Sequence, residues 1–360
     1  MEKYIMAGCD LHGESMMVKV AVNRGPSEKK EYGGGARDRR KLLGYLKKRA
    51  KEEGCEEIHL AYEASGLGFL LYDEAMAEGI KCYVLAPTKI EKSVKQKKSK
   101  TDERDAEQLL GIVRGHVLAG SAIPEIWVPD EGTRDARELL RRRLGVGEEA
   151  ARVKVQVKSL LKRNGMRAPK KTGEGWTAGM RKWLKDKSQK SSRLGQGSRL
   201  SLESMLRQLE MLEEEIEKLN VAVMKLSMNK RYESVCKELM MLDGVGVLVA
   251  MVFLTEMGDM GRFQNRRQVG NYLGLVPGSF ESGEQDDRKG HITHHGPGRI
   301  RKVLCQAAWV LIRGQGKEKE VYDRLVEKNP KHKKIAVVAL MRRLGIRMWH
   351  VGLEAQKKAA

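Results

Sequence analysis

The chain has 360 residues, which is enough for two or three domains that each bury a hydrophobic core. Its 69 Lys and Arg against 48 Asp and Glu give a formal net charge of +21, which indicates a polyanionic partner such as nucleic acid. Aromatic residues make up 5%, which argues against a single-strand binder built on stacked bases, and no apolar run approaches the length of a membrane-spanning helix.

The cysteines and the amino terminus indicate a cytoplasmic protein. The five cysteines are scattered and show no Cys-x-x-Cys spacing, as expected of reduced thiols. Met1 is followed by Glu2 and Lys3 rather than by a signal sequence. A membrane surface is the competing polyanion, and with neither a spanning helix nor a signal sequence we expect no membrane association.

Alternating and helical patterns predict an α/β domain over residues 1–125. Strands are expected at residues 4–9, 16–22, 32–35, 57–63 and 81–85, and helices at 37–53 and 67–78. A further helix is expected to begin at Asp102, after a basic loop. The resulting order, β-β-β-α-β-α-β and then a helix, places strand ends and a helix start at one edge of a sheet.

Four carboxylates fall where these elements converge. Asp10 follows the first strand, and Glu63 ends the fourth. Asp102 and Asp105 lie three apart at a helix start, so both face the same way. Each has an ordinary explanation, since acidic residues stabilise a first helical turn and occur at strand ends. Together they would repel one another without a cation, and we predict one or two Mg²⁺ (or Mn²⁺) ions that clamp a phosphodiester.

Residues 90–100 form a strongly basic segment that includes Lys95, Lys97, Lys98 and Lys100. Such a run is often only a solvated loop. Because it adjoins the expected metal site, where a phosphate backbone would have to lie, we predict that these lysines contact phosphate.

A heptad pattern predicts a helical arm within residues 126–230. Apolar residues alternate at spacings of three and four over more than three heptads. They are Leu202, Met205, Leu209, Leu212, Ile216, Leu219, Val223 and Leu226. A weaker seam from Val146 to Leu160 matches it, so an antiparallel hairpin that serves as an arm or as a dimer contact is one interpretation. We expect a homo-oligomer, dimer or tetramer, that forms through this arm.

Between the two seams, residues 165–200 are rich in Gly, Ser, Lys and Arg. One interpretation is a disordered linker. The other is a segment that orders on RNA, because Trp176 and Trp183 have the spacing of one helical face and indole stacks on unpaired bases. The nucleic-acid contacts expected in it are Lys170, Lys171, Trp176 and Arg181.

The region from residue 231 to residue 350 combines several candidate phosphate contacts. Gly244 and Gly246 form a turn between two short helices, where exposed backbone N–H groups bind phosphate. Ser282 precedes a glycine in a loop, where it is either a solvated turn residue or a nucleophile facing phosphate. Basic residues follow it: Lys289, Arg299, Arg301 and Lys302.

A cluster of histidines lies in the same region, and a short tail ends the chain. His291, His294 and His295 lack the further Cys or His that would complete a zinc site. We expect them to contact phosphate or solvent. Residues 351–360 are expected to form the tail.

Six short motifs are spread along the chain. They are Gly8-Cys9-Asp10, Glu63-Ala64-Ser65-Gly66, Lys100-Thr101-Asp102-Glu103-Arg104-Asp105-Ala106, Tyr272-Leu273-Gly274-Leu275-Val276-Pro277, Ser282-Gly283 and Ile300-Arg301. In these motifs the chain resembles, over nearly its whole length, the IS110 family of insertion-sequence transposases, the bridge-RNA-guided DNA recombinases. The resemblance implies a RuvC-like domain with an RNase H fold and a D-E-D-D metal site, followed by a mostly helical C-terminal domain with a nucleophilic serine. Carried over by motif, the carboxylates are Asp10, Glu63, Asp102 and Asp105, and the serine is Ser282.

The chain departs from that family in two places. Where the family usually reads Ile-Ser-Lys-x-Gly, this chain has Ile292-Thr293-His294-His295-Gly296, so a lysine contact is lost or replaced by histidine. The segment Leu11-His12-Gly13 lacks the common Ser-Lys. We expect neither departure to touch the ligands of the metal.

The resemblance implies a transposase that cuts and rejoins DNA in a bacterial or archaeal cell, near the nucleoid. Mg²⁺ held by the carboxylates assists attack of Ser282 on a phosphodiester, which links the serine to DNA through phosphate. A bridge RNA guides the enzyme to donor and target DNA by base pairing.

Two other classes of protein fit the same residues. One is a RuvC-like, metal-dependent junction endonuclease that hydrolyses with water, and the other is a non-catalytic nucleic-acid binder. If the serine is used, we expect it to meet the carboxylates of another protomer, because a long arm separates the two in the sequence.

Overall fold

The computed structural model describes residues 2–90, 101–173, 175–190, 193–279 and 289–359. The chain divides into two compact units, Met1–Val128 and Pro129–Ala360, and each is described by itself. In this described part of the chain, no helix combines the length and the apolar composition needed to cross a bilayer.

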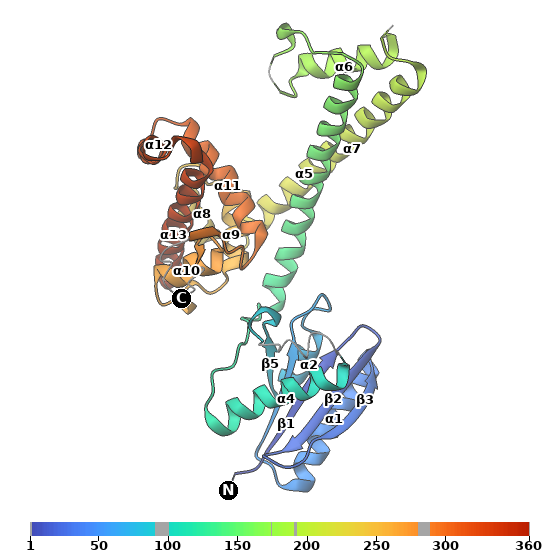
Figure 1. Ribbon diagram of the computed structural model, residues 1–360, viewed down its shortest axis with the longest axis vertical. Helices are drawn as coiled ribbons and strands as arrows, with labels where there is room; N and C mark the ends of the chain where they lie inside the picture. Colours follow the sequence, from blue (N-terminus) through green and yellow to red (C-terminus); the bar gives the residue numbers. More distant parts are fainter. Residues whose placement is uncertain (1, 91–100, 174, 191–192, 280–288, 360) are drawn as a thin grey trace. The chain divides into compact units, whose positions relative to one another are not determined.

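The first unit is built on a five-stranded sheet in the order β3-β2-β1-β4-β5 (Figure 1). Its strands are β1 (Tyr4–Leu11), β2 (Ser15–Val22), β3 (Glu28–Gly33), β4 (Glu57–Glu63) and β5 (Lys81–Leu85). The first three strands pair antiparallel, whereas β1, β4 and β5 run parallel. This mixed sheet and its element order agree with the α/β prediction and are consistent with an RNase H-like fold.

Strand β3 departs furthest from the range that the sequence pattern indicates. It begins at Glu28 rather than at residue 32. The strand lies at the edge of the sheet, where Lys29 and Glu31 are at least partly exposed and form an ion pair with each other at 2.8 Å. No residue of the strand is fully buried, so the strand needs no apolar face. Its sequence therefore lacks the alternation of apolar and polar residues that marks a half-buried strand.

Helices cover both faces of the sheet (Figure 1). Helices α1 (Ala36–Glu53) and α2 (Leu70–Ala77) pack on the face that carries Ile5, Ala7 and Cys9. Helix α4 (Asp102–Ala119) packs on the other face, against Met6. Since side chains alternate along a strand, Gly8 and Asp10 share the face of Met6 and lie beneath α4.

The second unit opens with a helical hairpin of α5 (Glu131–Arg163) and α7 (Gln196–Ser227) (Figure 1). The two helices are antiparallel, because Leu140 near the start of α5 shares a core with Val223 near the end of α7, whereas Val157 shares one with Leu202. Leu202, Leu209 and Val223 of the heptad seam are thus buried within the chain. An oligomer contact through this arm would use other residues.

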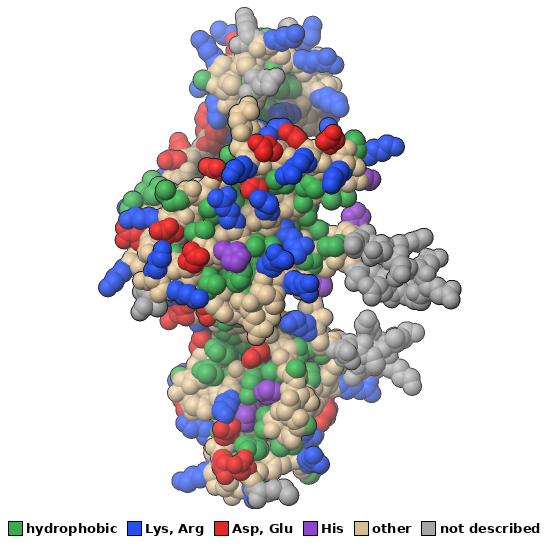
Figure 2. All heavy atoms as spheres, turned by 90° about the vertical axis from the view of Figure 1, so that its left-hand side faces the viewer, with side chains coloured by type: hydrophobic (Ala, Val, Ile, Leu, Met, Phe, Trp, Pro, Cys, Tyr) green, Lys and Arg blue, Asp and Glu red, His purple; other side chains and the backbone are tan. Residues whose placement is uncertain are grey.

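The tip of the arm is ordered around α6 (Ala178–Lys190). Trp176 precedes this helix, so it does not share a helical face with Trp183 as the spacing predicted. Both tryptophans are half-buried against the core of the arm. On the face that Figure 2 shows, Lys and Arg are the most frequent charged side chains at the tip, and α6 alone contributes Arg181, Lys182, Lys185, Lys187 and Lys190.

The remainder of the second unit is mostly helical. Its elements are α8 (Glu233–Met240), α9 (Val247–Met257), α10 (Arg266–Leu273), β6 (Pro277–Ser279), β7 (Lys289–Ile292), α11 (Gly298–Arg313), α12 (Lys317–Lys328) and α13 (Lys333–Ala359). Nearly all of α9 is buried, and α8, α11 and α13 pack around it in one hydrophobic core.

The expected tail is instead part of α13, which continues to Ala359. Ala355 is buried in the core. The side chain of Gln356 donates to the carbonyl of Gly258 and accepts from the N–H of Met260, both at 3.0 Å. The charged residues of this segment give no sign of these contacts in the sequence, which is why the sequence predicts only a tail here.

Candidate metal centre and nucleic-acid contacts

Helix α4 crosses β1 at a glycine. A Cβ atom on Gly8 would lie 2.3 Å from the carbonyl oxygen of Ala106 and 2.3 Å from the nitrogen of Leu110. No side chain fits there, so the backbone of α4 lies directly on the strand. This close approach holds the start of α4 beside Asp10, two residues beyond Gly8.

The start of α4 is fixed by its own contacts. Thr101 caps the helix, and its side chain accepts a hydrogen bond from the N–H of Arg104 at 3.4 Å. The buried Lys19 of β2 donates to the carboxylate of Glu103 at 2.6 Å. Asp102 is therefore the first residue of a helix that is capped and tied to the sheet.

Two of the predicted carboxylates and one histidine form a cluster. The Nε2 atom of His12 lies 3.2 Å from Oδ2 of Asp10 and 3.7 Å from Oδ1 of Asp102. One ligand atom from each of the three residues lies within 4.8 Å of the others. Two carboxylate oxygens and an imidazole nitrogen are donors that fit a divalent cation.

The environment of Asp10 disfavours its charged form. Its side chain is only 14% exposed, and this burial raises the pKa of the carboxyl group. The negative charges of Asp102 and Asp105 raise the pKa further, whereas His12 lowers it. A bound cation would relieve this accumulation of negative charge.

Glu63 and Asp105 are not among the three residues whose ligand atoms come together in the cluster. Glu63 ends β4. Because side chains alternate along a strand, Glu63 faces the same side of the sheet as Ala61, which packs with α4. The neighbouring strands β1 and β4 pair Cys9 with Tyr62, one residue before Asp10 and Glu63. Asp105 lies about one turn after Asp102 in α4, and its negative charge helps to raise the pKa of Asp10. A role for either residue in binding the ion stays a prediction.

His12 is the residue that sequence reasoning missed. The departure at Leu11-His12-Gly13 was expected not to touch the metal ligands, and this expectation is wrong, because the imidazole contacts Asp10. The available signal was the spacing Asp-x-His at a strand end. Strands β1 and β2 extend to Leu11 and Ser15, so the turn between them is tighter than predicted and holds His12 over the carboxylates.

The predicted nucleophile and the basic loop fall outside the described residues. Ser282 belongs to segment 280–288, and the four lysines Lys95, Lys97, Lys98 and Lys100 belong to segment 91–100. Among residues expected to bind nucleic acid in the arm, Lys170 and Lys171 lie in a short 3₁₀ helix, Lys170–Thr172. Their roles stay predictions.

Two arm residues expected to bind nucleic acid are engaged within the chain. Arg181 forms a two-pronged pair with Glu213, at 2.5 and 2.8 Å. The ring of Trp176 lies 5.7 Å from the amine of Lys154. Both residues also line a small cavity of about 330 Å³ beside Lys182.

Several C-terminal candidates have structural partners. Gly244 has φ +75°, and a Cβ there would lie 3.0 Å from the carbonyl oxygen of Ala307, so the turn needs glycine whether or not it binds phosphate. Gly246 caps α9, and open space surrounds it. Arg301 donates to the carbonyls of Leu273, His295 and Gly296, while Lys302 pairs with Glu148 at 2.5 Å. Of the others, Arg299 is exposed near the start of α11, and Lys289 begins β7.

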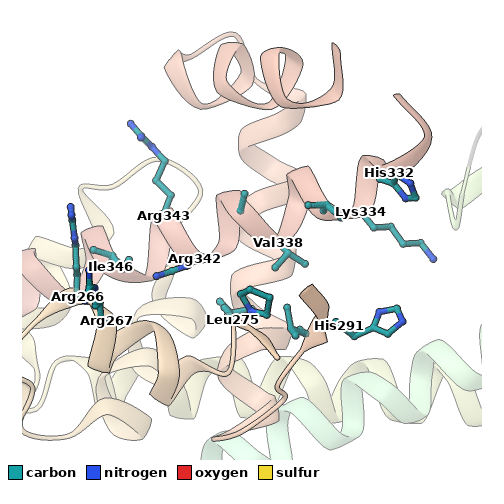
Figure 3. Close-up of a pocket in the computed structure, with 15 residues that line it drawn as sticks. Arg266, Arg267, Leu275, His291, His332, Lys334, Val338, Arg342, Arg343 and Ile346 are labelled. Atoms are coloured by element: carbon teal, nitrogen blue, oxygen red, sulfur yellow. The ribbon is translucent and has the colours of Figure 1, made fainter. Parts of the chain in front are cut away.

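A basic groove in the C-terminal region was not predicted. It has a volume of about 1210 Å³ and runs between α10, the β6–β7 strands and α13. Figure 3 shows Arg266 and Arg267 at one end and His332 and Lys334 at the other, with Val338 between them. Apolar residues form much of its wall, and no carboxylate is among the described residues that line it.

Two protein-family models match the chain. The model DEDD_Tnp_IS110, described as a transposase, matches residues 7–165 and so includes all four predicted carboxylates. The model described as "Transposase IS116/IS110/IS902 family" matches residues 236–323, which include Ser282.

Curated proteins of similar sequence carry related names. A "Putative transposase y4qE" of Sinorhizobium fredii is 31% identical over 71% of this chain and 58% of its own length. A "Transposase for insertion sequence element IS1533" of Leptospira borgpetersenii is 26% identical over 86% of each chain. A "Pilin gene-inverting protein" of Moraxella bovis is 26% identical over 29% of this chain and 32% of its own length.

Proposed function

Because the chain belongs to the IS116/IS110/IS902 family of transposases, we propose that it cuts and rejoins DNA at an acidic metal centre with Ser282 as the nucleophile. The observation that carries the proposal is the cluster in which ligand atoms of Asp10 and Asp102 come together. Both residues lie in the region that matches the DEDD transposase model. The name of the pilin gene-inverting relative favours a protein that rejoins DNA over one that only cuts it.

The carboxylates act on the reacting phosphate through the metal ions that they would hold. Asp10, Asp102, Glu63 and Asp105 would hold one or two divalent ions, Mg²⁺ or Mn²⁺. When bound, such an ion polarises the scissile phosphate and stabilises the charge that develops on its oxygens. The burial of Asp10 keeps water away from one side of the centre and strengthens every charge interaction there.

The serine step preserves the energy of the phosphodiester. The Oγ atom of Ser282 attacks phosphorus, and a new Oγ–P bond forms as the bond from phosphorus to the 3′ oxygen breaks. The serine proton ends on the released 3′ hydroxyl, which can later attack in the reverse sense to rejoin strands. No external energy source is needed, because one phosphodiester replaces another.

A covalent intermediate on a denaturing gel tests this proposal. The protein, with the RNA that co-purifies with it, is incubated with Mg²⁺ and DNA that carries the ends of its own insertion element, labelled at the 3′ end. The expected result is a labelled band at the mass of protein plus DNA, which is absent for Ser282→Ala. Cleaved DNA without any such band would instead support hydrolysis by water, as in a junction endonuclease. No cleavage and no adduct, with nucleic acid bound, would support a non-catalytic binder.

We propose further that the basic groove holds the backbone of the guide RNA. The strands β6 and β7, which line the groove, flank in sequence the segment that carries Ser282. Among the described residues, Arg266, Arg267 and Arg342 have no carboxylate within ion-pair distance, so their charges remain available for phosphate. A chain that binds RNA here would contact phosphates with these cations and sugar or base surfaces with the apolar wall.

Reversing the charge of the groove should weaken RNA binding. The double variant Arg267→Glu with Arg342→Glu is expected to lower the affinity for the co-purifying RNA at least about tenfold. It should also reduce the magnitude of the slope of log affinity against log salt by about 1.4 to 1.8, since each lost phosphate contact removes about 0.7 to 0.9. Fluorescence anisotropy over a range of salt concentrations measures both.

The control makes the same change in net charge elsewhere. Arg324→Glu with Lys328→Glu replaces two exposed cations of α12 that do not line the groove. If both double variants weaken binding equally, the overall charge of the protein rather than the groove is responsible, and the proposed contact is wrong.

A further inference from the structure

His12 lies in the candidate metal centre, and the family resemblance gives it no role there. We propose that its Nε2 atom is a ligand of the bound ion, which makes the centre a mixed nitrogen and oxygen site that prefers Mn²⁺ to Mg²⁺. The inference rests on the proposed function, because it takes the carboxylates to bind a divalent cation.

The position of the imidazole is set by the turn between β1 and β2. The backbone N–H of His12 donates to the carbonyl of Ser15 at 2.8 Å, and the adjacent residues Leu11 and Met16 are paired in the sheet. The ring therefore projects from a short, closed turn that directly continues the strand of Asp10. Its side chain is 45% exposed, so an ion can reach it from solvent.

The distances between the donors suit a shared ion. Bonds of about 2.1 Å place neighbouring ligands of a six-coordinate ion about 3 Å apart. The Nε2 atom of His12 lies 3.2 Å from an oxygen of Asp10 and 3.7 Å from an oxygen of Asp102. The donors come from the end of β1, the β1–β2 turn and the start of α4, and their ligand atoms lie within 4.8 Å of one another.

The chemistry of the donors determines which ion is favoured. Mg²⁺ prefers oxygen ligands and keeps several waters, so an imidazole adds little to its binding. First-row transition ions bind imidazole more strongly, and Mn²⁺ also accepts carboxylates readily. The neutral ring adds a ligand without adding to the repulsion between Asp10 and Asp102. A centre with His12 should therefore discriminate more strongly between the two ions than one without it.

A simpler role for His12 gives the opposite result. If the imidazole served only as an ion-pair partner of Asp10, it would compete with any cation for that carboxylate. Its removal would then strengthen the binding of Mg²⁺ and Mn²⁺ alike. The two roles thus differ in the direction of a measurable change.

The test measures metal binding to the full chain without DNA. Wild type, His12→Ala and His116→Ala are titrated with Mg²⁺ and with Mn²⁺ by calorimetry, and bound Mn²⁺ is examined by pulsed EPR. His116 is the matched control, since it lies on α4 in the same unit and contacts the carbonyl of Ser121 instead. Fourteen residues of helix separate it from Asp102, a distance of about 21 Å.

The expected result is a loss of Mn²⁺ affinity of about tenfold or more in His12→Ala, with Mg²⁺ affinity changed by less than about twofold. Modulation from a directly bonded nitrogen should be present in the EPR of wild type and of His116→Ala, and absent in His12→Ala. Unchanged Mn²⁺ affinity, tighter binding of both ions, or no nitrogen modulation in wild type would each overturn the inference.

A further variant separates this inference from the proposed function. Asp102→Asn is expected to weaken both ions together. If it does not, the carboxylates do not form the metal site and the proposed function itself fails. If it does, and His12→Ala has no effect on Mn²⁺ binding, only the role given to His12 is wrong.

Discussion

Replacing Asp102 by Asn is expected to lower the rate of Mg²⁺-dependent strand cleavage by at least about a hundredfold, the upper end of the cost of losing a partner that only supports a ligand. The amide has the shape of the carboxylate but lacks its charge. It binds a divalent cation far more weakly, so the phosphate would lose both its orientation and the stabilisation of its developing charge.

The fold should survive this change. The side chain of Asp102 is 54% exposed, and its nearest charged neighbours include Asp10, which it repels. Loss of the favourable interaction with the helix terminus costs about 0.3–1 kcal/mol, and relief of the repulsion offsets part of it. Thermal unfolding followed by circular dichroism should therefore show a similar melting temperature for Asp102→Asn and wild type.

A matched control makes the same chemical change in the same unit. Asp38→Asn removes a carboxylate from the first turn of α1, which packs on the opposite face of the sheet from α4. This variant should cleave DNA at close to the rate of wild type. Cleavage by Asp102→Asn at that same rate would contradict the assignment of the metal centre.

Side-chain alternation explains why much of the first unit could be predicted from the sequence. The pattern over residues 4–9 and 57–63 gave two buried strands, and their parallel pairing brought Asp10 and Glu63 to neighbouring strand ends. The acidic start of α4 agreed with helix-capping rules, with Thr101 as the cap. These features depend on local periodicity, which is directly visible in a sequence.

Contacts between distant residues could not be predicted in the same way. The charge of Arg181 suggested nucleic acid, but nothing local indicated its pairing with Glu213, thirty-two residues away. His12 was overlooked because its contact with Asp102 depends on how tightly the β1–β2 turn closes, and strand ends are poorly marked in a sequence. The groove of α10 and α13 joins segments that no pattern connects.

The close approach of α4 to Gly8 could not be predicted either, because in the sequence this glycine is only part of a short motif. Gly8→Ala is expected to destabilise the first unit by about 3 kcal/mol or more, because overpacking against backbone atoms cannot be relieved by a change of rotamer. Its methyl group would lie 2.3 Å from backbone atoms of both Ala106 and Leu110, so α4 would have to move away from β1. That movement would carry Asp102 away from Asp10, and the variant that still folds should bind Mn²⁺ weakly.

The control for Gly8→Ala is the same substitution within α4 itself. A Cβ on Gly111 would meet no atom within 4 Å, so Gly111→Ala should stabilise the helix by about 0.5–1 kcal/mol. Urea denaturation followed by circular dichroism gives both free energies of unfolding, and a Mn²⁺ titration of the folded proteins gives the effect on the metal centre. If the two variants had equal stability and equal affinity for Mn²⁺, α4 would not lie as closely on β1 as described. If Gly8→Ala lost stability but kept its affinity, the close approach would serve packing alone, and another contact, such as that between Lys19 and Glu103, would position Asp102.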